Sequence, residues 1–323
     1  MKEDILVSIN CTTYNQESYI EQAIESFLMQ KTNFKYEILI NDDASTDGTT
    51  DIIKKYEKKY PDIIKPIYQQ ENQYSKGIKV GYEYNFKRAK GKYIALCEGD
   101  DYWTDPYKLQ KQVDYMESNP SCTLCMHAVE KIDAKTRESK GFIRPHNLNK
   151  KCTTEEVILG GGGFVGTNSL LFPRKLFKNP PMWYFDSPVG DYPMQIFLTH
   201  KGYSYYIDEN MSVYRTNAMN SWSERMSQEK IKNWIILNSK INSLLDQVNV
   251  DTNKKYDLVI GEVKINNDFN IALMKDDFKS MRKKEFKDLY SKLDRKTKIK
   301  KMIKYYFPQS KKIANYLRRN NNE

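Results

Sequence analysis

The stretch Tyr93 to Trp103, YIALCEGDDYW, constrains this chain more than any other, because an apolar run ends there abruptly in three carboxylates. The apolar residues at its start are typical of a strand that is covered on both faces in an α/β sheet. Glu98, Asp100 and Asp101 follow at once, and Gly99 lets the backbone turn sharply between them. In open α/β sheets, ligands bind beyond the carboxyl ends of the strands. The sequence therefore predicts a polar site directly after this strand.

Three carboxylates placed this closely repel one another unless a cation lies among them. Ligands that are all oxygens suit Mg²⁺ or Mn²⁺ bound together with substrate phosphates. We therefore expect Glu98, Asp100 and Asp101 to hold Mn²⁺ or Mg²⁺ beside a diphosphate. The triplet alone leaves a solvated acidic turn open as the alternative.

The length of 323 residues allows one large α/β domain with an appendage. No apolar run reaches the roughly 20 residues that a membrane-spanning helix needs. No signal peptide precedes the first predicted strand, Ile5 to Asn10, so we expect a cytoplasmic location. The five cysteines are odd in number and lie mostly in apolar segments, which indicates reduced structural thiols.

The positive charge of the chain is concentrated at its C-terminal end. Residues 279–323 contain 16 Lys and Arg against 4 Asp and Glu, whereas residues 1–278 contain 36 against 38. A basic tail on a nearly neutral body usually contacts an anionic surface, either a membrane leaflet or nucleic acid. We expect Lys298 to Arg319 to lie on an anionic leaflet. The alternative is a solvated helical end that packs on a partner subunit in a homo-oligomer.

Two further segments place polar side chains beyond predicted strands. The first strand leads into Thr12 and Tyr14, and the second strand, Tyr36 to Ile40, leads into Asp42 and Asp43. A carboxylate there can accept a hydrogen bond from a base imide or a ribose hydroxyl, and a tyrosine ring can stack on a base. The alternative is that the two aspartates merely cap the next helix.

The rest of the chain is predicted to continue the α/β pattern. Its expected parts are a helix from Thr49 to Tyr60, strands at Ile63 to Tyr68, Ser121 to Val129 and Asn168 to Pro173, a polar excursion from Thr136 to Lys151, a mobile loop from Gly160 to Phe164, and a closing pair of short strands at Tyr203 to Ile207 and Met211 to Tyr214. Asp191 follows Gly190 at the start of a predicted helix, where a simple N-terminal cap is an equal alternative to a chemical role. Beyond Ser223 only helices are expected.

Four blocks together carry a family resemblance: VSINCTTYNQESYIEQAIESFLMQ, EILINDDASTDGT, GKYIALCEGDDYWTDPYKLQKQ and GDYPMQIFLTHKG. They resemble the family 2 glycosyltransferases of the GT-A fold, in the family's order and over roughly residues 4 to 222. The resemblance implies a Rossmann-like nucleotide-diphospho-sugar transferase domain at residues 1–222. A helical, basic C-terminal region at residues 223–323 follows it.

The resemblance also implies roles at the nucleotide. Thr12, Tyr14 and Asp43 match residues that hold the base and ribose. Lys76 lies where some relatives carry a basic residue near the diphosphate, and Gly99 belongs to the same nucleotide-binding set.

At the reacting centre, Glu98 and Asp100 match the metal-binding acid pair, and Asp101 follows as in many members. Asp191 matches the catalytic base of inverting members. Asn217 stands where many relatives have a histidine after Tyr-Arg, which puts a histidine–metal contact in doubt.

The resemblance implies a metal-dependent inverting glycosyltransferase of surface or capsular polysaccharide synthesis, peripheral to the inner leaflet. Its donor is expected to be a nucleotide-sugar, UDP-linked, and its acceptor a glycan or a polyprenyl-linked glycan. One alternative is a nucleotidyltransferase. Such an enzyme would need a phosphate-binding loop near the N-terminus, and the segment TTYNQES is not one. The other is a nucleic-acid-binding protein acting through the basic tail, although we expect no nucleic-acid partner.

Overall fold

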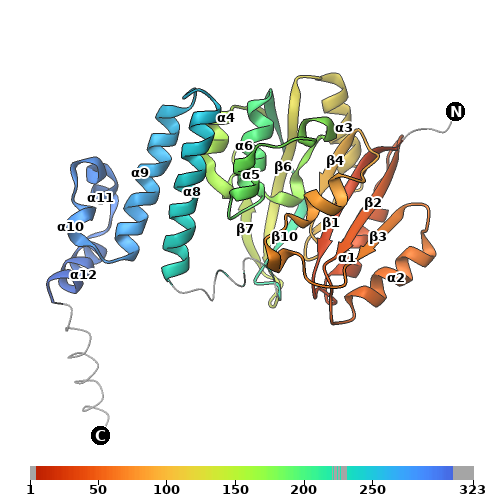
Figure 1. The fold of residues 1–323 in the computed structure, drawn as a ribbon, viewed down its shortest axis with the longest axis horizontal. Coiled ribbons are helices and arrows are strands. Elements are labelled where there is room, and N and C mark those ends of the chain that lie inside the picture. Colours follow the sequence, from red (N-terminus) through yellow and green to blue (C-terminus); the bar gives the residue numbers. More distant parts are fainter. Residues whose placement is uncertain (1–4, 220, 222–223, 225, 227–230, 308–323) are drawn as a thin grey trace, which may run out of the picture. The chain divides into compact units, whose positions relative to one another are not determined.

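The computed structural model describes residues 5–219, 221, 224, 226 and 231–307 of the chain. It divides into two compact units, Met1–Gln228 and Glu229–Glu323. Figure 1 follows the chain from the strands of the first unit, in red to green, to the helices of the second unit, in blue.

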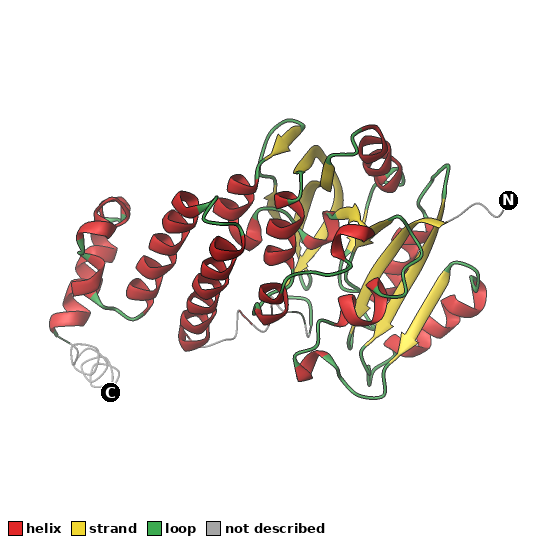
Figure 2. Ribbon diagram, turned by 45° about the horizontal axis from the view of Figure 1, so that its top comes forward, coloured by secondary structure: helices red, strands yellow, loops and turns green. Residues whose placement is uncertain are grey.

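One mixed sheet runs through the described part of the first unit, and it is drawn in yellow in Figure 2. Its strands are β1 (Ile5–Thr13), β2 (Lys35–Asp42), β3 (Ile64–Tyr68), β4 (Tyr93–Leu96), β5 (Tyr102–Trp103), β6 (Cys122–Asp133), β7 (Ser139–Ile143), β8 (Lys150–Cys152), β9 (Leu171–Pro173) and β10 (Tyr203–Thr216). The order is β3-β2-β1-β4-β9-β6-β10-β5, with β7 on β6 and β8 on β10. β1 pairs in parallel with both β2 and β4. The strand order therefore reverses at β1, where the two neighbouring carboxyl ends leave a crevice.

Alternating residues of the strands build two separate layers of core. In β1, Val7, Ile9 and Cys11 pack with the apolar faces of helices α1 (Ile20–Leu28), α2 (Thr49–Lys59) and α3 (Lys108–Ser118). Ser8 and Asn10 face the other side, as the period of two in a strand requires. On that side the π-helical turn η2 (Gly81–Phe86) contacts β1 and β2.

Aromatic side chains fill much of this second layer. Phe177, in the 3₁₀ turn η5 (Arg174–Phe177), makes ring contacts with Phe86, Phe172 and Phe197, the last from helix α6 (Asp191–His200). Aromatic pairs at these distances add to the free energy of burial. The layer thereby anchors α6, whose first residue is Asp191.

The α/β class predicted from the sequence is confirmed, and several local expectations are corrected. The expected closing pair of strands is instead the single 14-residue strand β10. Its pairing with β6 shifts in register around Asn210, because a bulge absorbs the polar residues that looked like a turn. The expected excursion from Thr136 to Lys151 contains β7 and most of β8.

The glycine run is also more ordered than predicted. Helix α4 (Thr154–Gly160) begins with a capping box, in which Thr153 Oγ1 accepts a hydrogen bond from the Glu156 backbone N–H at 3.3 Å. The 3₁₀ turn η3 (Gly161–Gly163) follows directly. The segment from Gly160 to Phe164 thus ends one helix instead of forming an open loop. Helix α5 (Met182–Asp186) lies between this region and α6 in the chain.

The second unit contains helices α8 (Ile231–Asp251), α9 (Asp257–Met274), α10 (Phe278–Met281), α11 (Lys287–Lys292) and α12 (Arg295–Tyr306). A small core gathers Phe269, Ala272, Met281 and Phe286. Among the described helices, none combines the length and the apolar character needed to span a bilayer. The part of the expected membrane segment from residue 308 to Arg319 lies outside the described residues.

The approach to β4 gives a testable prediction about packing. A Cβ atom at Gly91 would lie 2.5 Å from the Ser8 backbone nitrogen and 2.7 Å from the Val7 carbonyl carbon, whereas nothing lies within 4 Å of one at Gly163. Gly91→Ala should therefore lower the free energy of unfolding by about 1–3 kcal/mol, as overpacking does. Gly163→Ala, the control, should change it little. Urea denaturation compares the two, and equal midpoints would contradict the close packing of Gly91 on β1.

Candidate active site

The acidic turn runs beside the end of β1. The backbone N–H of Cys97 donates to the Asn10 carbonyl oxygen at 3.1 Å, and that of Gly99 donates to the Thr12 carbonyl oxygen at 3.0 Å. A Cβ atom at Gly99 would lie 2.8 Å from Thr13 Oγ1, so a side chain at this position needs its neighbours to move. The close approach explains why glycine separates the acids, and it brings the nucleotide-side residue Thr12 to the same edge.

The three predicted metal ligands are brought together. Carboxylate oxygens of Glu98, Asp100 and Asp101 lie within 4.8 Å of one another. Asp101 Oδ1 accepts a hydrogen bond from the Arg215 backbone N–H at 2.9 Å. Asp101 Oδ2 is buried and has no hydrogen-bond partner among the described residues. An orphaned buried oxygen next to two further carboxylates fits a hard divalent cation, because such cations take oxygen ligands.

The electrostatics of the cluster favour a cation as well. Burial raises the pKa of Asp101 well above its usual range, and the charge of Asp100 adds to the rise. Desolvation followed by the charges of Asp100 and Asp191 raises the pKa of Glu98, although this residue is exposed and water screens part of the effect. Burial also raises the pKa of Asp100. A bound divalent cation would favour the ionised form of all three carboxyls.

Arg215 also binds the acidic turn. It is not among the site residues predicted from the sequence. Its guanidinium donates to the Asp100 carbonyl oxygen. The same group lies 4.5 Å from the centroid of the Tyr102 ring and 5.1 Å from that of the Tyr19 ring. Because Arg215 is buried, its charge acts on the acids with little screening and lowers the pKa of Asp100 and Asp101 against the effect of burial. The Tyr-Arg pair before Asn217 was the available sequence signal.

Asn217 contacts the end of β6 through its side chain. Its Nδ2 donates to Asp133 Oδ2 at 3.1 Å, at the end of β6. The backbone of Asn217 has a φ of 59°, a left-handed conformation that asparagine tolerates better than most residues. The residue therefore helps to set the backbone conformation directly after β10.

The two aspartates after β2 have different partners. Asp42 accepts from the Ser45 backbone N–H at 3.1 Å and from the Thr50 hydroxyl, so it stabilises the start of α2. Asp43 accepts from the backbone N–H groups of Gln73 at 2.8 Å and Tyr74 at 3.0 Å. Neither aspartate caps a backbone N–H of α2: Asp42 holds the turn before this helix and the Thr50 side chain, while Asp43 holds the loop after β3. Each oxygen of Asp43 retains lone-pair capacity for a further donor.

The remaining nucleotide-side candidates lie around the same strand ends. Thr12 is half-buried at the end of β1, and Tyr14 just beyond it is 37% exposed. Lys76 ends the 3₁₀ turn η1 (Tyr74–Lys76) and forms an exposed ion pair with Glu71. Within the described part of the chain, no hydrogen bond or ion pair joins Lys76 to the acidic cluster.

Asp191 lies at the first position of α6. Its Oδ1 accepts from the Tyr192 backbone N–H at 2.8 Å, and its carboxylate also accepts from the Thr167 hydroxyl. Burial raises the pKa of Asp191, while these hydrogen bonds and the charge of Lys79 oppose the rise. The charge of Asp191 in turn raises the pKa of Glu98. A carboxylate with a raised pKa at the start of a helix is suited to accept a proton.

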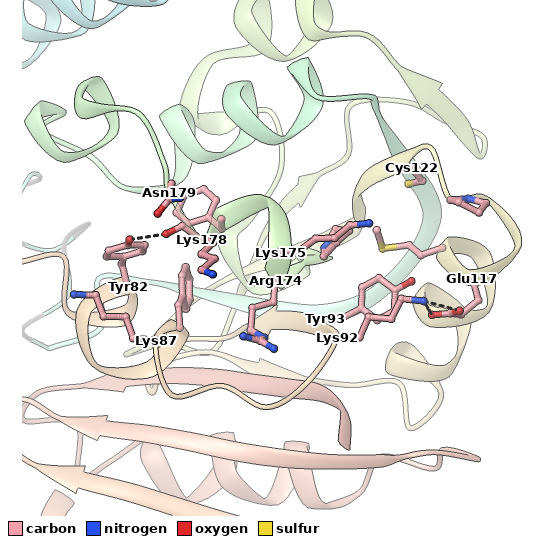
Figure 3. Close-up of a pocket in the computed structure, with 15 residues that line it drawn as sticks. Tyr82, Lys87, Lys92, Tyr93, Glu117, Cys122, Arg174, Lys175, Lys178 and Asn179 are labelled. Carbon is pink, nitrogen blue, oxygen red and sulfur yellow. Dashed lines mark hydrogen bonds and ion pairs between the residues drawn. The ribbon is translucent and has the colours of Figure 1, made fainter. Parts of the chain in front are cut away.

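A separate cavity of about 820 Å³ opens at the opposite edge of the sheet, and Figure 3 shows its lining. Tyr93 begins β4 there, and Pro173 ends the antiparallel strand β9, so the cavity lies at the amino end of β4 and the acids at its carboxyl end. Its Lys92 is paired with Glu117 at 2.6 Å. The acids, and not the lining of this cavity, combine clustered carboxylates with a strand-end crevice.

Comparisons with known proteins identify the family of the chain. The model of the family described as glycosyl transferase family 2 matches residues 8–177. The uncharacterized protein Rv1520 of Mycobacterium tuberculosis is 34% identical over 269 residues, which cover 80% of this chain and 72% of that protein. WfaP of Escherichia coli, named as a UDP-Glc:α-D-GlcNAc-diphosphoundecaprenol β-1,3-glucosyltransferase, is 41% identical over 113 residues, or 35% of this chain and 42% of its own.

Among solved structures, the mannosyltransferase PcManGT of Pyrobaculum calidifontis in complex with GDP-Man and Mn²⁺ superposes with a TM-score of 0.53. The match covers 94% of this chain and 87% of that one at 12% sequence identity, so it supports the fold alone. The family model spans more than half of the chain and contains both strand ends and the acidic turn. The chain therefore belongs to glycosyl transferase family 2.

Proposed function

We propose that the protein is a metal-dependent inverting glycosyltransferase that moves a sugar from a UDP-linked donor to a glycan or polyprenyl-linked acceptor. The observation that carries the proposal is the buried Asp101 Oδ2, which has no hydrogen-bond partner among the described residues, within a cluster of three carboxylates. The name of WfaP, which states a UDP-glucose donor and a lipid-diphosphate acceptor, supports the choice of both substrate classes. The acidic cluster is assigned to Mn²⁺ or Mg²⁺.

The donor would bind across the strand ends. Asp43 would accept a hydrogen bond from the base or the ribose, Tyr14 would stack on the base, and Thr12 would contact the nucleoside from the end of β1. Tyr14 is exposed enough to meet a ligand, and the Gly99 N–H bond to the Thr12 carbonyl brings the acids next to that nucleoside. This arrangement directs the diphosphate toward Glu98.

The chemistry is a single displacement. The Asp191 carboxylate takes the proton of the acceptor hydroxyl while that oxygen bonds to the anomeric carbon of the donor sugar. The bond from the anomeric carbon to the diphosphate oxygen breaks, and the diphosphate leaves with the electron pair. A bound divalent cation would supply charge neutralisation for this leaving group. Attack opposite the leaving group inverts the anomeric configuration.

The second unit offers a surface for the membrane where polyprenyl-linked acceptors are found. On α12, the side chains of Ile299, Met302 and Ile303 are each about 40% exposed, and Tyr306 is 60% exposed. Their spacing of three and four residues places them on one helical face, with lysines interspersed along the helix. An exposed apolar stripe among lysines is the pattern of a helix that lies in an anionic interface.

Metal binding gives the first test of this proposal. Mn²⁺ in large excess should raise the melting temperature of the wild type, since a ligand at 100 times its Kd adds about 2.7 kcal/mol of stability. Asp100→Asn should lose the shift without unfolding, because it removes a charged ligand from a repulsive cluster. Asp51→Asn, at an exposed position on α2, is the control and should keep it. Full transfer activity in EDTA would contradict the metal assignment.

The base assignment gives the second test. With the nucleotide-sugar that stabilises the protein best among UDP-glucose, UDP-N-acetylglucosamine and GDP-mannose, Asp191→Asn should lower transfer by about 10² or more while donor binding stays nearly constant. Asp186→Asn, an exposed neighbour, should change neither. Because burial raises the pKa of Asp191, wild-type activity should fall on acidification at a higher pH than an ordinary aspartate would give. NMR should show an inverted product, and retention would remove Asp191 from this role.

The membrane assignment is tested by sedimentation with vesicles of phosphatidylglycerol and phosphatidylcholine. The wild type should pellet with the anionic vesicles at low salt, because each basic residue near such a surface contributes about 1 kcal/mol. Ile303→Glu should weaken this binding, whereas Leu258→Glu, at an exposed apolar position on α9, should not. A wild type that stays in the supernatant would favour an oligomer contact for this region.

A further inference from the structure

Lys79 connects two segments of the site that are far apart in the chain. Its ammonium group donates to the Ser187 carbonyl oxygen at 2.8 Å and to the Val189 carbonyl oxygen at 3.1 Å. It also lies 5.7 Å from the centroid of the Tyr184 ring. The two carbonyls belong to the short stretch between α5 and α6, and this stretch leads directly into Asp191.

The surroundings of Lys79 suggest more than a structural bond. The side chain is half-buried, and desolvation lowers the pKa of its ammonium group. Within the described residues it forms no ion pair with a carboxylate, so two neutral carbonyls are its recorded acceptors. The charge that acts on Lys79 is that of Asp191, which raises the pKa of the lysine against the effect of burial. The ammonium group is therefore held by two neutral carbonyl oxygens of the stretch that leads into Asp191.

The segment that carries Lys79 also reaches the nucleoside side of the site. Asp43 fixes the backbone N–H groups of Gln73 and Tyr74, and Gly77 then turns the chain with a φ of 82°. Two residues later, Lys79 binds the stretch before Asp191. A single short segment thus runs from the acid assigned to the base and ribose to the carboxylate assigned as the proton acceptor.

We infer that Lys79 is a positioning residue for sugar transfer: by donating to the Ser187 and Val189 carbonyl oxygens, its ammonium group fixes the stretch before α6 and so holds the Asp191 carboxylate in place. The inference rests on the proposed function, since it needs Asp191 to be the base. It differs from a diphosphate-binding role for a lysine of this loop, which would act on the donor and not on Asp191.

The test compares Lys79→Met, Lys79→Arg and the control Lys87→Met, using the most stabilising of the three nucleotide-sugars named above with Mn²⁺. Lys87 follows η2 and is half-exposed, with its charge paired to Glu83. Lys79→Met should lower kcat about tenfold or more while the KM for the donor stays within about twofold, since a small displacement of a reacting group costs up to about 10²-fold. Lys79→Arg, which keeps the charge and the donors, should recover most of the loss, and Lys87→Met should behave as wild type.

A double variant separates action through Asp191 from action on the donor. Adding Lys79→Met to Asp191→Asn should cause little further loss, because a positioning residue has nothing left to position. Losses that multiply, or a raised KM with unchanged kcat, would overturn the inference and assign Lys79 to the donor. Donor-induced thermal stabilisation of each variant verifies that it is folded. If Lys79→Met does not fold, Lys79→Arg is compared with the wild type in its place, alone and combined with Asp191→Asn.

The inference and the proposed function fail in different ways. If Asp191→Asn turns over like the wild type, Asp191 is not the base and the inference falls with the proposed function. If Asp191→Asn is inactive while Lys79→Met turns over like the wild type, the inference alone is wrong.

Discussion

The crowding of three carboxylates at the carboxyl end of β4 is the constraint on which the rest of the site depends. Ionised acids crowded together and partly removed from water are unstable, and burial raises the pKa of Asp100 and Asp101. The fold offsets part of this cost with Arg215, whose backbone and guanidinium both bind the acidic turn. What remains is an oxygen of Asp101 that has no hydrogen-bond partner among the described residues. Strain of this kind is characteristic of binding sites, because a ligand can relieve it.

The sheet brings the other parts of the site to this turn. β1 lies between β2 and β4, all in parallel, so the residues after three strands meet at one edge. Gly99 allows the acidic turn to approach β1 closely, and the aromatic layer around Phe177 fixes the helix that begins at Asp191. The strand ends after β1 and the start of α6 are therefore supported by different layers of core. Lys79 donates to the stretch that leads into α6.

Much of the fold and of the site was predictable because the signals were local. The apolar run before Glu98 and the amphipathic helices depend on residues that are neighbours in the chain. The prediction failed at β10, where a bulge around Asn210 resembles a turn in the sequence, and at β7 and β8, whose exposed polar strands lack an apolar alternation. In such segments pairing with a neighbouring strand decides the structure, and local propensity does not.

The sequence by itself determined the family, the α/β class and the acids that follow β4, because covalent adjacency places Glu98, Asp100 and Asp101 together whatever the rest of the chain does. Only the tertiary structure decided which charged residues from distant parts of the chain contact the segments of the site. Arg215 reaches Asp101 from 114 residues away, and Lys79 reaches Ser187 across 108 residues. It also separated Asp42, which stabilises α2, from Asp43, which faces the loop after β3. Contacts between residues so far apart in the chain arise from the packing of distant segments. They cannot be predicted from the spacing of residues in the sequence.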